Sequence, residues 1–409
     1  MSGSRLVFGL CAALALTMTG VFAFPALLPT FVAEWGLSKT EAGWIAGLYF
    51  AGYAGVAPPV IALTDRIDAR LVMLGGTLTT AVAAAGFALL ASGFWSALAF
   101  RILAGAGLAA TYLPGVRALV DRYRGAHASR AVSFYTSSFS LGTALSFFVA
   151  GETAAAFGWR SAFAVCALAA LAATVVPFLL APVTPERAAS APAALLDFRP
   201  VLRNHRALAF VLGYGVHCWE LFAVRSWLVA FLVFGLTLDT GGCGSPLCSP
   251  TMIATLSGLV AMAASILGNE ICVRFGRRRV ITLVMLLSVV AAAGFGLAAG
   301  LPYPLLAAVA LLYAAVIQLD SAALTAGTIE AAAPGQRGAT LAVHAFVGFG
   351  CAGIGPLVLG VVLDASGGGA TASSWGFAFL SVAAVGTLGP VAMLLLGRPP
   401  QKRRSSRSM

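Results

Sequence analysis

Charged residues are scarce in this sequence. Of its 409 residues only 10% are Asp, Glu, Lys or Arg, whereas 60% are hydrophobic, and the mean hydropathy is +0.95. A water-soluble domain carries about 25% charged residues on average. The shortage excludes a domain whose whole surface faces water, and it predicts a protein whose main solvent is the lipid bilayer.

The sequence also lacks the alternating pattern of a membrane β-barrel, whose strands of about 10 residues switch between apolar and polar side chains. Its apolar runs are continuous and long enough for helices, which need roughly 20 residues to cross a bilayer. We therefore expect an all-α polytopic membrane protein with twelve transmembrane helices. The expected spans are 6–31, 41–63, 71–93, 96–116, 131–152, 161–181, 207–235, 251–272, 280–300, 304–327, 339–364 and 375–397.

The first of these runs has an alternative interpretation as a secretory signal peptide, because Ser4 and Arg5 precede it and small residues lie near Ala23. The run is longer than a typical signal core, and it continues through Pro25 and Pro29 into a chain that is itself membranous. We therefore expect it to be a transmembrane span.

Motifs of enzymes and of ATP-driven pumps are absent. The sequence contains no Gly-x-x-x-x-Gly-Lys-Ser/Thr loop for phosphate, its four His residues are scattered, and no nucleophile and base stand together. Five cysteines lie singly in different spans and give no metal pattern: Cys11, Cys166, Cys218, Cys272 and Cys351. We expect neither an enzyme nor a bound cofactor or metal, so any transport must use an ion or solute gradient.

Two further cysteines, Cys243 and Cys248, share the Gly-rich loop 241–250 between the seventh and eighth spans. This loop falls on the expected outer, oxidising side of the membrane, where disulfides persist. A local disulfide and two unpaired thiols are both left open.

The basic residues are distributed unevenly between the loops. Of the 25 Lys and Arg residues, 21 fall at the N-terminus, in alternate loops or in the C-terminal tail, whereas the opposite loops hold only Lys39 and Arg160. Because short cytoplasmic loops are enriched in Lys and Arg, both termini are expected in the cytoplasm of a bacterial-type inner membrane. The net charge of +11 is spread over this membrane rim, so we do not expect nucleic-acid binding. The basic tail 398–409 serves topology or touches anionic lipid.

The sequence divides into two similar halves. A Pro-rich and charged stretch at 182–206 predicts a cytoplasmic linker between six-helix bundles at 1–181 and 207–397. The halves echo each other: Gly142 corresponds to Gly350, and Gly151 corresponds to Gly360. Such repeats are a common signature of secondary transporters, whose substrate site lies between the repeats near the membrane midplane. We expect a monomer in the bilayer that binds a small-molecule substrate.

Two loops carry a family resemblance. Residues 63–70 read LTDRIDAR after the second span, and residues 274–279 read RFGRRR after the eighth span. Both resemble the Gly-x-Leu-x-Asp-Arg-x-Gly-Arg-Arg loop of the major facilitator superfamily, and they stand at the two positions where that family has it. Arg101, Gly105 and Gly107 resemble the Arg-x-x-x-Gly-x-Gly pattern of its fourth span. The resemblance implies a twelve-helix transporter that works by alternating access.

The loops also depart from the family pattern. Asp68 stands where the family prefers Gly, and Val273 replaces the Asp of the second loop, where an ion pair of Glu270 with Arg274 is an expected substitute. The fifth span lacks the Gly-Pro pair of the drug/proton antiporter branch, so this assignment is weakened. The predicted conformational gate comprises Asp65, Arg66, Arg70, Glu270, Arg274, Arg277 and Arg278.

Ionisable residues inside spans are few, and each one needs a partner or a wet cavity. On the seventh span, His217 and Glu220 share one helical face, whereas Arg225 lies about 140° around from Glu220. Tyr112 shares a face with Arg101, and Tyr313 shares one with Asp320. The resemblance implies that spans 1, 4, 7 and 10 line the central cavity. The predicted substrate or proton path is Arg101, Tyr112, His217, Trp219, Glu220, Arg225, Tyr313 and Asp320, with His344 a further ionisable candidate in the eleventh span.

These groups suggest proton coupling. A carboxylate in the membrane can be neutral when desolvated and ionised when an Arg reaches it, so its protonation can follow conformation. If Glu220 and Asp320 carry protons while substrate binds, two Arg residues are left for an anion, which favours a small organic anion or polar solute. A proton-driven drug efflux antiporter and a non-transporting membrane receptor are the alternatives.

The topology can be tested by thiol labelling. After reduction, a membrane-impermeant maleimide is expected to label Cys243 and Cys248 in intact cells, because their loop is expected on the outer side. Labelling of these two cysteines only in inverted vesicles would contradict the predicted orientation.

Overall fold

The structure is a computed structural model that describes all residues except 1–2, 124–127, 181–197, 240–244 and 398–409. Its described residues form helices and connecting turns without a strand, and twelve helical segments are long and apolar enough to cross a membrane. Each segment overlaps one predicted span, although the first continuous segment is Gly3–Gly20 whereas the predicted first span is 6–31. The predicted fold class is therefore confirmed.

The first six spans run up to the linker. Their helices are α1 (Gly3–Thr17), η1 (Met18–Gly20), α2 (Ala23–Ala26), α3 (Leu28–Trp35), α4 (Lys39–Thr64), α5 (Ala69–Leu90), α6 (Phe94–Arg122), α7 (Ala128–Phe157), α8 (Trp159–Ala173) and α9 (Val175–Leu179). The first span therefore consists of four short helical pieces.

The remaining helices follow the linker. They are α11 (Arg199–Arg203), α12 (His205–Leu238), η2 (Pro246–Cys248), α13 (Pro250–Phe275), α14 (Arg277–Phe295), η3 (Gly296–Gly300), α15 (Tyr303–Gln318), α16 (Ser321–Ala331), α17 (Arg337–Ala365), α18 (Ala372–Gly386) and α19 (Leu388–Leu395). The described part of the predicted linker 182–206 is thus partly helical, because α11 and the start of α12 lie in it. The predicted basic tail lies outside the described residues.

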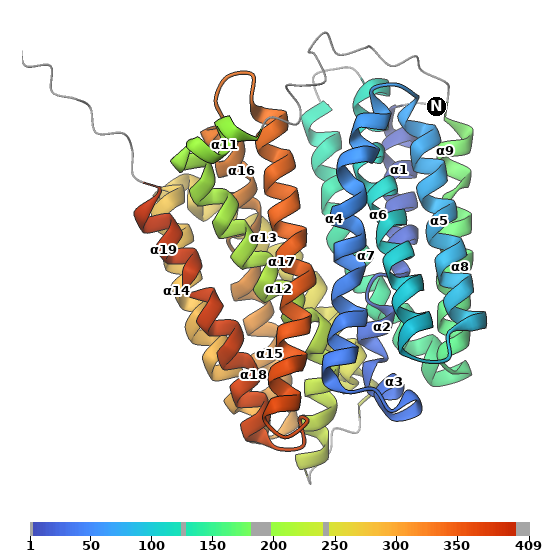
Figure 1. Ribbon diagram of the computed structural model, residues 1–409, viewed down its shortest axis with the longest axis vertical. Helices are drawn as coiled ribbons and strands as arrows, with labels where there is room; N and C mark the ends of the chain where they lie inside the picture. Colours follow the sequence, from blue (N-terminus) through green and yellow to red (C-terminus); the bar gives the residue numbers. More distant parts are fainter. Residues whose placement is uncertain (1–2, 124–127, 181–197, 240–244, 398–409) are drawn as a thin grey trace, which may run out of the picture.

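The helices before and after the linker form two groups that lie side by side (Figure 1). The start of α1 and the end of α19 lie at the same end of the molecule, which we call the terminal end, and the connection between α3 and α4 lies at the opposite, far end. Below, the helices α1 to α9 are called the N-half, and α11 to α19 the C-half.

The two halves meet along α4 and α17, where glycines let the backbones come close. A Cβ atom on Gly43 of α4 would lie 2.7 Å from the Pro356 carbonyl oxygen of α17, and one on Gly47 would overlap the Gly353 carbonyl. Any larger side chain at these positions would push the helices apart. The small residues therefore permit the tight contact between the halves, as small residues commonly do between membrane helices.

A carboxylate also links the halves at the far end. Asp364, near the end of α17, accepts hydrogen bonds from the backbone amides of Lys39 and Thr40 at 3.0 and 2.7 Å and from the Thr40 hydroxyl at 2.6 Å. It thus caps the first turn of α4, where unpaired amides and the helix dipole favour a negative charge. The α4 terminus also has its own capping box, in which Ser38 and Glu41 bond each other within the N-half.

We expect Asp364→Asn to weaken the closed far end, because loss of a helix cap costs about 0.5–2 kcal/mol and 1 kcal/mol shifts an equilibrium about fivefold. Electron spin resonance between labels at the exposed residues Ser92 and Ala372, in a protein without the free cysteines, should then show a larger population of long distances.

Glu41→Gln is the matched control, because it alters a carboxylate at the same helix start that has no bond to the C-half. Equal distance distributions in wild type and Asp364→Asn would contradict the role of this contact.

Candidate functional site

The first span is interrupted near its middle. Pro25 has no amide hydrogen, so the carbonyl of Val21 has no donor four residues ahead. Arg101 of α6 supplies the missing donors: Nη2 donates to the Val21 carbonyl at 2.8 Å and Nη1 donates to the Gly20 carbonyl at 3.1 Å. Ser146 of α7 donates to the Thr19 carbonyl at 2.7 Å. The break is therefore held by side chains of neighbouring spans, as backbone in a bilayer requires.

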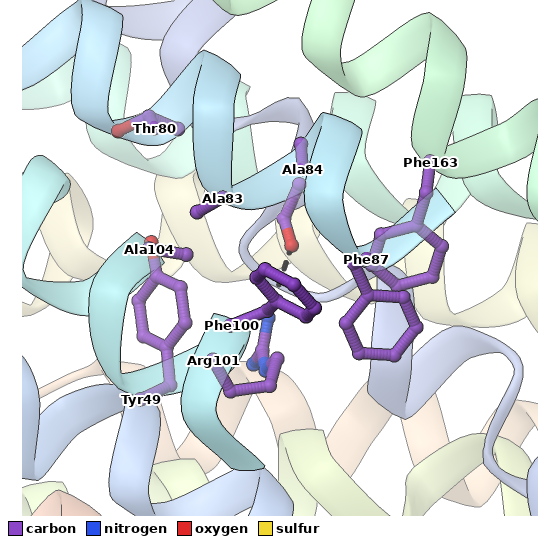
Figure 2. Close-up of a pocket in the computed structure, with 10 residues that line it drawn as sticks. Tyr49, Thr80, Ala83, Ala84, Phe87, Phe100, Arg101, Ala104 and Phe163 are labelled. Atoms are coloured by element: carbon purple, nitrogen blue, oxygen red, sulfur yellow. Dashed lines mark hydrogen bonds between the residues drawn. The ribbon is translucent and has the colours of Figure 1, made fainter. Parts of the chain in front are cut away.

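The Arg101 guanidinium also lies against an aromatic ring and a small pocket. Its Cζ atom is 4.2 Å from the centre of the Tyr49 ring, a cation–π distance. Figure 2 shows Arg101, Tyr49 and Phe100 around this pocket of about 20 Å³, which is about the size that one water molecule needs. Arg101, which is predicted for the substrate or proton path, thus lies inside the N-half, and its guanidinium donates hydrogen bonds to two backbone carbonyls.

Tyr112, which shares a helical face with Arg101, packs against α7. Its ring lies 6.0 Å from that of Tyr135 and 5.6 Å from that of Phe139, both on α7. The Tyr135 hydroxyl donates to the Tyr112 carbonyl at 3.2 Å. Tyr112 therefore helps to join α6 to α7.

Glu220 lies near the middle of α12 and is buried. Its Oε1 accepts hydrogen bonds from the Ser288 hydroxyl of α14 and the Tyr313 hydroxyl of α15, both at 2.7 Å. No described cationic side chain forms an ion pair with it. Tyr313 was predicted on the face of Asp320 and is found on Glu220, and Ser288 was not predicted, because a lone serine in an apolar run gives no signal.

His217 and Asp320 form the second polar pair of the C-half. The His217 Nδ1 atom lies 2.8 Å from Asp320 Oδ1, an ion-pair distance if the ring is protonated, although the alignment is not that of a hydrogen bond. Asp320 occupies the turn between α15 and α16, where the tenth span is interrupted. His344 lies 3.0 Å from the Thr328 hydroxyl and stacks on Tyr214 at 3.8 Å. Both histidines therefore have partners in the C-half.

Arg225 has weaker contacts than any of these groups. Its Nη2 atom lies 3.5 Å from Gln318 Oε1, at the limit of a hydrogen bond, and its Cζ atom lies 5.9 Å from the Phe22 ring of the N-half. The side chain is buried, and no described carboxylate lies within ion-pair distance. Trp219, one of the predicted path residues, is also buried, and its Nε1 has no partner among the described residues.

The predicted gate residues of the first loop bond within the N-half. Asp65 lies 3.5 Å from Arg117, and Arg70 lies 3.2 Å from Asp68. The shortest ion pair joins Asp68 to Arg122 at 2.7 Å. Asp68, which departs from the family pattern, thus contributes a contact that the pattern did not predict.

The second loop bonds within the C-half. Arg277 pairs with Glu330 at 2.8 Å, and Arg278 donates to the carbonyls of Met393 and Leu394, both at 2.9 Å. Glu270 and Arg274 are both exposed, and the described structure contains no ion pair between them. The expected substitute pair is therefore corrected: the carboxylate that pairs with this loop is Glu330 of α16, in the tenth span, and its partner is Arg277.

The loop cysteines can be assigned only in part. Cys248 is disulfide-bonded, which favours the disulfide over two unpaired thiols, while Cys243, its predicted partner, lies outside the described residues. The other five cysteines are free thiols. No group of three or more metal-ligating side chains occurs in the described part of the chain.

Comparison with known proteins gives a consistent family. The profile of the "Major Facilitator Superfamily" matches residues 10–317. The niacin transporter NiaP of Acinetobacter baylyi is 33% identical over 159 residues, which is 39% of this chain and 35% of that protein. Protein spinster homolog 3 of Danio rerio is 26% identical over 206 residues, 48% of this chain and 41% of that protein. The chain thus aligns with less than half the length of these curated relatives.

Solved structures show the same fold over nearly the whole chain. A bacterial homologue of the human lysosomal transporter Spinster, in an inward-facing and occupied conformation, has a TM-score of 0.78 and 16% identity and covers 97% of both chains. The nucleoside transporter NupG has a TM-score of 0.76 and 15% identity and covers 97% of this chain and 100% of its own. At these identities the likeness supports the fold alone.

The gate contact of Asp65 can be tested by substitution. Asp65→Ala should slow turnover several-fold and leave substrate affinity within a few-fold, because its contact with Arg117 would set the balance between conformations and not the binding site. Arg66→Ala, at the neighbouring predicted gate position, is expected to have the same effect. Initial uptake rates and binding constants of a solute found by a binding screen measure both quantities.

Asp121→Ala is the control, since Asp121 holds the same Arg117 at 3.0 Å within one helix turn and does not join helices. An unchanged turnover of correctly inserted Asp65→Ala protein would exclude the gate role.

Proposed function

From the premise that the chain belongs to the Major Facilitator Superfamily and is a membrane transporter, we propose that it moves a small organic anion by alternating access coupled to protons. The binding site lies where the two halves meet near the membrane midplane, as in other transporters built from repeats. The first solutes to test are small carboxylates and other polar molecules.

The unpaired guanidinium of Arg225 is the observation that supports an anionic substrate. A buried cation in a membrane needs a partner, because an isolated charge at the bilayer centre costs at least about 2.5 to 3.5 kcal/mol. Arg101 already has two carbonyl partners, whereas Arg225 has a single contact at the limit of hydrogen bonding. A substrate carboxylate would provide the missing negative charge.

Glu220 is the proposed proton-coupling carboxylate. Its partners are two hydroxyl groups, which can donate to Oε1 whether the carboxyl group is neutral or ionised. A change of conformation that brings a cation or water to Glu220 would favour its ionised form, and one that removes them would favour its neutral form. His217 lies one helical turn before Glu220 on α12, and its Nδ1 atom is 2.8 Å from Asp320 Oδ1, so His217 and Asp320 are the next candidates to share the proton.

The contacts between the halves support an inward-facing arrangement, if both termini are cytoplasmic. Asp364 ties the halves together at the far end, whereas the ion pairs of Asp65 and Arg277 at the terminal end stay within one half. A cycle would then break the contact of Asp364 and close the terminal end.

The relative named as a niacin transporter is consistent with an anionic substrate, because niacin is a pyridine carboxylate. Niacin therefore belongs in a thermal-shift screen of the purified protein, beside other carboxylates, sugars, amino acids, nucleosides and cationic drugs at two pH values. Stabilisation by carboxylates would support the proposal, and stabilisation by cationic drugs alone would favour the efflux alternative.

Glu220→Gln should abolish accumulation driven by a pH gradient, because the amide keeps the shape of the side chain and cannot exchange a proton. Substrate binding should stay within a few-fold, and exchange of labelled for unlabelled substrate should continue. Uptake by proteoliposomes with and without an imposed pH gradient measures the difference.

Glu152→Gln is the matched control, because Glu152 is an exposed carboxylate on α7. Accumulation by Glu220→Gln with the wild-type pH dependence would exclude this role and direct attention to Asp320.

A further inference from the structure

A layer of aromatic rings fills the contact between the two halves. The Phe222 ring of α12 lies 4.3 Å from the Phe50 ring of α4 and 6.3 Å from Phe22 beside the break in the first span. One turn away, the Tyr53 ring of α4 lies 4.0 Å from Phe349 of α17. Each of these pairs joins one half to the other, so the layer must rearrange whenever the halves move.

Three hydrogen-bond donors at this layer have no partner. The Tyr53 hydroxyl, the Trp219 indole nitrogen and the Ser226 hydroxyl are buried, and none is bonded to another described residue. Trp219 and Ser226 stand three residues before and four residues after Phe222, so they share the face of α12 on which Phe222 meets the N-half. Buried polar groups in folded proteins nearly always have partners, so three orphans around one contact require an explanation.

Arg225 adds a positive charge to the same region. It precedes Ser226, and its guanidinium lies 5.9 Å from the Phe22 ring and 3.5 Å from the Gln318 amide oxygen. The groups without strong partners at this layer are thus a cation, an indole N–H and two hydroxyls. This set offers donors to a ligand that carries acceptor oxygens and favours an anion over a cation.

We propose that this layer is the substrate site and that its substrate is a small planar aromatic monocarboxylate. The carboxylate would pair with the Arg225 fork and accept from the orphaned donors, while its ring would stack among Phe22, Phe50 and Phe222. One carboxylate is inferred because, of the two Arg residues predicted for the path, Arg101 is bonded to Gly20 and Val21, whereas Arg225 has no described carboxylate or carbonyl partner closer than Gln318 at 3.5 Å. The inference rests on the proposed function and defines its substrate class.

Access to the site follows from the packing. The rings of Phe50 and Phe222 are in direct contact and buried, so a ligand can enter only when the halves separate slightly. Binding would therefore replace contacts between the halves by contacts to the substrate. This exchange couples occupancy of the site to the conformation of the transporter.

The first test compares three ligands of matched size on the purified full-length protein by calorimetry. Benzoate carries both features, cyclohexanecarboxylate has the charge without the aromatic ring, and benzamide has the ring without the charge. We expect benzoate to bind at least about tenfold more tightly than benzamide and about threefold more tightly than cyclohexanecarboxylate. Equal binding of benzoate and cyclohexanecarboxylate would overturn the aromatic class, and equal binding of benzamide would overturn the anionic class.

The second test uses substitutions that change the donors of the proposed site: Tyr53→Phe and Trp219→Phe each remove one donor and keep an aromatic ring, and Arg225→Lys keeps the charge without the planar fork. Tyr53→Phe and Trp219→Phe should each weaken benzoate binding about fivefold, and Arg225→Lys should weaken it about tenfold. Tyr303→Phe is the matched control: its hydroxyl is also buried without a partner, but it lies on α15 away from the layer, and its removal should leave benzoate binding unchanged. Equal losses in Tyr303→Phe and Tyr53→Phe would overturn the assignment.

Transport separates this inference from the proposed function. If benzoate does not bind and another solute is accumulated with the pH gradient, the substrate class is wrong and the transporter proposal stands. If benzoate binds with the expected pattern, the proposed site is supported. Should the Glu220→Gln protein then still accumulate benzoate, only the proton-coupling role of Glu220 is contradicted.

Discussion

The bilayer gives buried polar groups no water, and the structure depends on how the chain satisfies them. The strongest example is the interrupted first span, whose carbonyls at Thr19, Gly20 and Val21 receive donors from Ser146 and Arg101. These bonds connect the first span to the fourth and fifth, and they fix the position of Phe22 at the contact with the other half. Arg101, which is predicted from the sequence to lie on the substrate or proton path, thus holds the interrupted backbone of the first span within the N-half.

The same constraint divides the polar groups of the C-half into satisfied and unsatisfied ones. Glu220, His217 and His344 each have a close partner within the C-half, whereas Arg225 and the donors of Trp219 and Ser226 do not. A group such as Glu220, whose hydrogen-bond partners are protein side chains, needs no bound ligand to be stable and can serve in proton exchange. Buried donors without a partner at the contact between the halves would contribute most to the free energy of ligand binding, because the cost of removing them from water is already included in the folded state. This division underlies the separate roles proposed for Glu220 and Arg225.

The sequence was sufficient to predict the twelve spans and the family, because continuous apolar runs of about 20 residues have few structural alternatives. It also located Glu220, His217 and Asp320 inside spans. It did not predict their partners. Tyr313 and Asp320 are seven residues apart and would share a face of an unbroken helix, but the tenth span is interrupted at Asp320, so this spacing no longer applies. Ser288, Glu330 and Arg122 were missed because one polar residue in a span or loop gives no periodic signal.

The central claim is that entry of a small anion through this protein is accompanied by a proton. It is tested most directly by the external pH of a weakly buffered suspension of proteoliposomes, recorded when the transported anion is added without an imposed gradient. The account predicts that the medium becomes more alkaline as the anion enters, in proportion to its uptake. Uptake of the same anion at constant external pH would contradict it.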